Sequence, residues 1–117
     1  MLGSVLIVLG LLFWFGNALS LIPVHMLLGL LLVLTLWTLA VLAVRARVQP
    51  GFVVLGIVWG AVVPILGLTQ DQLLPGPMHG IIRVLHLLLG LGAIGVAEML
   101  AARSLAGLPE RRAQAAA

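Results

Sequence analysis

The chain has 117 residues, of which 63% are apolar and only 8% are charged, and its mean hydropathy is +1.32. A soluble domain of this length cannot bury so much apolar surface, so the composition predicts an integral membrane protein. The formal net charge of +3 comes from arginines and gives no reason to expect a nucleic-acid partner, and the absence of cysteine excludes disulfides and thiolate metal sites.

Four apolar runs follow one another along the chain. Each is close to the roughly 20 residues that cross a hydrocarbon core as a helix. They are Leu2–Phe15, Val24–Val44, Phe52–Leu68 and Met78–Ala102. The sequence therefore predicts an all-α fold, an integral membrane four-helix bundle over residues 1–104. Residues 105–117 are expected to form a short polar tail on the cytoplasmic side.

Turn-forming residues separate these runs. The separators are 16–23, 45–51 and 69–77, and Pro77 suits the first turn of the last helix. The first run resembles a signal peptide in length, but no positive charge precedes it, so we interpret it as a helix.

The arginines are distributed unevenly between the two sets of loops. Arg45 and Arg47 lie in the second loop, and Arg103, Arg111 and Arg112 follow the last helix. Because cytoplasmic loops of membrane proteins are enriched in arginine, we expect a multi-pass protein of the cell inner or plasma membrane with both termini in the cytoplasm. The loop after the third helix would then face outward.

The second and fourth apolar runs resemble each other. Residues 24–30 read Val-His-Met-Leu-Leu-Gly-Leu, and residues 85–91 read Leu-His-Leu-Leu-Leu-Gly-Leu. The first and third runs align through Gly10 and Gly56. This pattern predicts two repeated helical hairpins related by a pseudo-two-fold axis along the membrane normal, which places His25 opposite His86.

The ionisable residues within the apolar runs are few and are therefore functional candidates. They are His25, His79, Arg83, His86 and Glu98. His25 and His86 lie at depths that differ by only about 5 Å along their helices. Gly29 and Gly90 follow them by four residues and remove a side chain from the same helix face.

These features resemble the four-helix, bis-histidine membrane cytochromes b, through the helical plan and the two His-x-x-x-Gly segments at His25 and His86. The resemblance implies haem b bound within the bundle, with these two histidines as iron ligands, Gly29 and Gly90 lining the haem, and Arg83 near the haem propionates. Diheme members carry two well-separated histidines on each of two helices. Here the second helix has only His25, and His79 lies only seven residues before His86, which implies one haem.

The resemblance also implies electron transfer with an unidentified redox partner. No catalytic residues are visible, so the chain is interpreted as an electron carrier rather than an enzyme. Glycine on several helix faces favours a homodimer.

Two alternatives remain open. The pairs His25-Met26 and Met78-His79 combine imidazole with thioether, a donor set that suits Cu(I) and would make a copper-handling protein, with His79 as a further metal ligand. For His79 by itself we favour an interfacial position near the helix end. A haemless accessory or transport subunit is the other alternative, and Pro64 in the third run and the glycine-rich faces support it.

Overall fold

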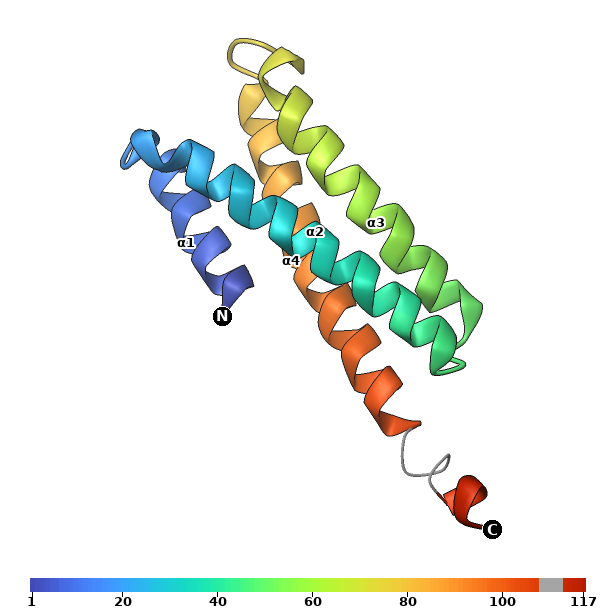
Figure 1. Ribbon diagram of the computed structural model, residues 1–117. Coiled ribbons are helices and arrows are strands. Elements are labelled where there is room, and N and C mark those ends of the chain that lie inside the picture. The colour runs from blue at the N-terminus through green and yellow to red at the C-terminus, as the bar shows by residue number, and fades with distance from the viewer. Residues whose placement is uncertain (108–112) are drawn as a thin grey trace.

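The computed structural model describes residues 1–107 and 113–117 and is all-α. Figure 1 shows the four long elements and the turns that join them. The elements are α1 (Leu2–Trp14), the 3-10 turn η1 (Leu19–Leu21), α2 (Ile22–Arg45), α3 (Pro50–Thr69), the 3-10 turn η2 (Gln70–Gln72) and α4 (His79–Ala106). Helices α2 and α4 contact each other along the middle of the molecule, and α1 and α3 each pack against both.

Three of these helices are long and apolar enough to cross a membrane. Helices α2, α3 and α4 have 24, 20 and 28 residues. Helix α1 has 13 residues, and at about 1.5 Å per residue it extends about 20 Å, less than the roughly 30 Å of a hydrocarbon core. The fold is therefore three candidate membrane-spanning helices and a short N-terminal helix, rather than four helices of spanning length.

Two helices begin earlier than their apolar runs because proline belongs to their first turn. Pro23 is the second residue of α2, and Pro50 is the first residue of α3. Proline is well tolerated there because its missing N–H has no intrahelical partner in any case. Pro77 behaves differently: α4 begins only at His79, after the cap residue Met78, so Pro77 is a turn residue.

Helix α4 ends later than its apolar run. It continues through Arg103 to Ala106, because an arginine near a helix end can extend its charged group toward the interface while the backbone stays helical. The first two residues of the expected tail are thus helical, as are residues 113–116. Arg111 and Arg112, on which the expected cytoplasmic side of the C-terminus partly rests, lie outside the described residues.

Close contacts between α2, α3 and α4 form the core of the bundle. Leu36 of α2 and Leu100 of α4 are fully buried, and Gly56 of α3 lies against both of their side chains. The indole N–H of Trp37 donates to the carbonyl of Ile57, with 3.2 Å between nitrogen and oxygen. Most of the other large apolar side chains remain exposed, as expected for a bundle whose outer surface faces lipid.

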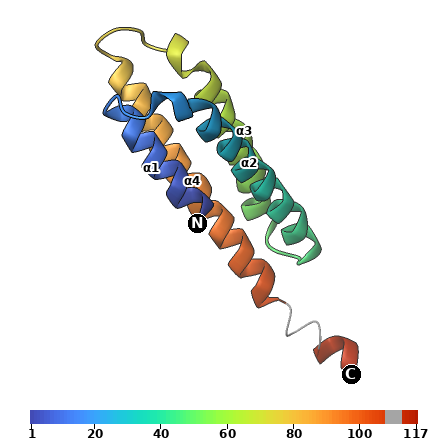
Figure 2. The ribbon, with the colours of Figure 1, turned by 60° about the vertical axis from the view of Figure 1, so that its left-hand side comes forward.

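Figure 2 shows the same arrangement from another side. In both views the α1–α2 turn and the α3–α4 turn lie at one end of the bundle, and the α2–α3 turn lies near the other end. Helices α2 and α4 therefore run in the same direction, and residues near their starts lie at the same end.

Candidate functional site

His25 and His86 face each other near the shared end of α2 and α4. His25 lies in the first turn of α2, and His86 lies in the second turn of α4. The centroids of their imidazole rings are 6.4 Å apart, and the ring planes are inclined by 53°. The structure thus brings together the two histidines that the sequence singled out.

Each of these histidines also lies against a glycine of the preceding helix. A Cβ added to Gly10 of α1 would lie 3.8 Å from Cε1 of His25, and one added to Gly67 of α3 would lie 3.1 Å from Cε1 of His86. Phe13 of α1 meets the His25 ring edge-on, with centroids 5.4 Å apart. The two rings are therefore held between all four helices.

This arrangement corrects the expected register between the first and third helices. The alignment matched Gly10 with Gly56, but Gly56 lies against Leu100, far from the histidines along α3. The glycine that lies against His86 is Gly67. The missed signal is in the sequence, where Val-Leu-Gly-Leu over residues 8–11 resembles Ile-Leu-Gly-Leu over residues 65–68.

The facing histidines have nitrogen atoms without hydrogen-bond partners. Within the described part of the chain, Nδ1 of His25 and Nδ1 of His86 are both buried and make no hydrogen bond. A buried polar atom without a partner costs free energy, and most such atoms in folded proteins are satisfied. The facing rings therefore leave two buried nitrogen atoms unsatisfied.

Gly29 and Gly90 leave space beside the histidines. A Cβ added at either position would meet no atom within 4 Å, whereas one added at Gly92, two residues after Gly90, would lie 2.6 Å from the side chain of Trp59. The two glycines on the histidine faces therefore do not serve close helix packing.

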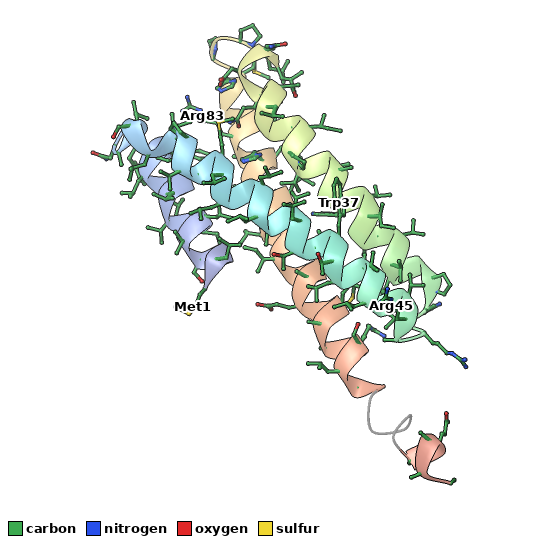
Figure 3. The ribbon with its side chains drawn as sticks, in the orientation of Figure 1. Met1, Trp37, Arg45 and Arg83 are labelled. Carbon is green, nitrogen blue, oxygen red and sulfur yellow. The ribbon has the colours of Figure 1, made fainter. Side chains whose placement is uncertain are left out.

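Arg83 and His79 lie nearer the end of the bundle than the histidine pair. Together with Asp71 they line an open cavity of about 360 Å³ beside the α3–α4 turn. Nδ1 of His79 is 3.3 Å from the carbonyl oxygen of Leu73, which ties this histidine to the turn. Figure 3 shows Arg83 near this end and Arg45 at the opposite end.

The two methionines of the copper alternative have exposed side chains. The side chains of Met26 and Met78 are 52% and 54% exposed, and His79 is occupied by the turn. Within residues 1–107 and 113–117, no group of three or more His, Cys, Asp or Glu side chains is placed to hold a metal ion. A haem iron with two histidine ligands does not need such a group.

Comparison with known proteins adds no further indication, because no protein-family model, curated protein or solved structure matches this chain. The function therefore has to follow from the histidine pair.

Proposed function

We propose that this chain is a membrane electron carrier that holds one haem b between His25 and His86. The observation that carries the proposal is the pair of imidazoles that face each other from α2 and α4, with their ring centroids 6.4 Å apart. When two imidazoles bind one metal ion from opposite sides, each metal–nitrogen bond is about 2 Å long, and each nitrogen lies about 1 Å from the centroid of its ring. The two ring centroids are then about 6 Å apart. The observed separation of 6.4 Å is close to this value.

Gly29 and Gly90 are compatible with a large planar group beside the histidines. Each lies one turn from its histidine on the same helix face, and each leaves open the volume that a side chain would fill. A bare ion between two rings requires no such space. A haem held by both histidines would supply one-electron transfer.

Arg83 is the residue that would bind the haem carboxylates. It lies three residues before His86 on α4, and its side chain is exposed at the end of the bundle that the histidines share. A guanidinium binds a carboxylate with two parallel hydrogen bonds and compensates its charge.

The proposal includes two repeated hairpins, α1–α2 and α3–α4. Two independent equivalences support the repeat: His25 with His86, and the glycines that lie against them, Gly10 with Gly67. Helix α1 would then be a fourth crossing element, reaching across a locally thinned bilayer. Both termini would face the cytoplasm because the arginine-rich end of the bundle is expected there.

Absorbance of the purified protein, expressed with ample haem, tests the proposal directly. We expect a six-coordinate, low-spin haem b spectrum that sharpens on reduction. His25→Ala or His86→Ala should abolish or convert this spectrum, whereas the matched control His79→Ala should leave it nearly unchanged because His79 bonds to the turn. Arg83→Leu should retain haem and lower its reduction potential, since removing a nearby positive charge favours the oxidised iron.

The copper alternative gives different results in the same experiment. Replacing both Met26 and Met78 by Leu should leave the haem spectrum intact, because both side chains are exposed. A colourless native protein that stays colourless on haem addition would refute the cytochrome proposal. A colourless protein that also loses a bound metal in the double methionine variant would favour copper.

A further inference from the structure

A second cavity lies at the opposite end of the bundle from the histidines. It has a volume of about 600 Å³ and is lined by the α2–α3 turn, by the end of α4 and by Gln114 of the C-terminal segment. Arg47 and Gln49 of the turn line it, and Arg103 lines it from α4. Among the described residues that line it, none is acidic. Two guanidinium groups that are distant in the sequence therefore meet at one polar cavity.

Arg103 is positioned by an aromatic ring. The central carbon of its guanidinium lies 3.9 Å from the centroid of the Phe52 ring, at the start of α3. A cation over an aromatic face is attracted by the ring electrons. This contact holds the guanidinium of Arg103, which also lines the cavity.

Arg47 occupies a backbone conformation that favours glycine. Its φ is +56°, and it follows the last turn of α2, where its N–H donates to the carbonyl of Val44 and the N–H of Val48 donates to the carbonyl of Ala43. This is a Schellman ending, in which glycine is the usual residue at the left-handed position. Arg47 therefore places a positive charge in the α2–α3 turn although its backbone conformation is less favourable for arginine than for glycine.

We propose that this cavity binds the phosphate of an anionic phospholipid such as phosphatidylglycerol. Guanidinium groups bind phosphate oxygens in pairs, and basic cavities between membrane helices at the headgroup level are suited to anionic lipids. We favour lipid over free phosphate because the cavity lies where α2 ends and α3 begins, and both helices are long and apolar enough to cross a membrane. This site is distinct from the histidine pair, so the two proposals stand or fall separately.

Native mass spectrometry of the full chain released from detergent tests the site. We expect the wild-type chain to retain phosphatidylglycerol in preference to phosphatidylcholine, which carries no net charge. Arg47→Gln should weaken this binding about fivefold, the effect expected for losing one arginine near an anionic surface, and Arg103→Gln should do the same. Arg45→Gln is the matched control. Arg45 lies two residues before Arg47 and carries the same charge, but its side chain does not line the cavity.

The outcomes distinguish a specific lipid-binding site from non-specific attraction between anionic lipid and a basic surface. Equal losses in Arg45→Gln and Arg47→Gln would overturn the proposal in favour of a non-specific basic surface, and unchanged binding in Arg47→Gln would overturn it outright. Retention of inorganic phosphate by the wild-type chain without any retention of phosphatidylglycerol would refute the lipid as the occupant. If Arg103→Gln fails to fold for want of the Phe52 contact, Arg47→Gln decides alone, with its helicity checked by circular dichroism.

Discussion

At the scale of single residues, Gly67 determines where the His86 ring can lie. A methyl group there would approach Cε1 of His86 to 3.1 Å, so the ring has to move by a few tenths of an ångström. We expect Gly67→Ala to destabilise the protein by about 1 kcal/mol and to lower haem retention. Thermal melting in detergent and absorbance would measure the two effects.

Gly10→Ala is the control for this prediction. The added methyl would lie 3.8 Å from His25, an ordinary contact, and alanine favours a helix over glycine. This variant should be neutral or slightly stabilising. If both variants behave alike, the contact between Gly67 and His86 does not constrain the ring.

The sequence predicted that His25 and His86 face each other, because ionisable residues in apolar runs are rare and the matching His-x-x-x-Gly segments put the two histidines in one register. It did not identify Gly67. One leucine-rich helix can be aligned on another at several registers with similar agreement, and the contact across two helices depends on how they cross. Hydropathy alone does not contain that crossing geometry.

At the scale of helices, tryptophan rings pack against glycines of the neighbouring helix: Trp37 of α2 against Gly60 of α3, and Trp59 of α3 against Gly92 of α4. Gly92 of α4 lies against Trp59, whose indole N–H donates to the carbonyl of Leu89 at 2.9 Å. A methyl group at Gly92 would lie 2.6 Å from the ring, closer than real contacts allow. We expect Gly92→Ala to destabilise the α3–α4 contact by about 1–3 kcal/mol.

Gly95→Ala on the same helix is the control, because its methyl would meet nothing within 4 Å. Thermal melting followed by tryptophan fluorescence would compare the two variants. We expect a lower melting temperature and a changed emission only for Gly92→Ala. A similar loss in Gly95→Ala would mean that glycine flexibility, rather than the space for Trp59, is what α4 requires.

The existence of the helices was predictable because lipid requires long apolar runs. Their ends were less predictable. The last apolar run ends at Ala102, yet α4 continues to Ala106. The third apolar run begins at Phe52, yet α3 begins at Pro50. The first run equalled the others in apolar character, but its helix ends at Trp14 and remains short of spanning length.

At the scale of the whole molecule, positive charge is concentrated at one end. Arg45, Arg47 and Arg103 lie at the end with the α2–α3 turn, while Arg83 lies at the other end. The arginine-rich end is expected in the cytoplasm. The exposed residues Ser20 and Gln72, which belong to η1 and η2 at the other end, would then face outward.

Single cysteines can test this orientation without background because the chain contains none of its own. In intact cells, an impermeant thiol reagent should label Ser20→Cys and Gln72→Cys but not Ala106→Cys at the end of α4, whereas a permeant reagent should label all three. If the impermeant reagent labels only Ala106→Cys, the end of α4 faces outward and the expected orientation is wrong. Different results for Ser20→Cys and Gln72→Cys would show that the two turns do not share a side, which would contradict the shared end of α2 and α4 and, with it, the facing histidines.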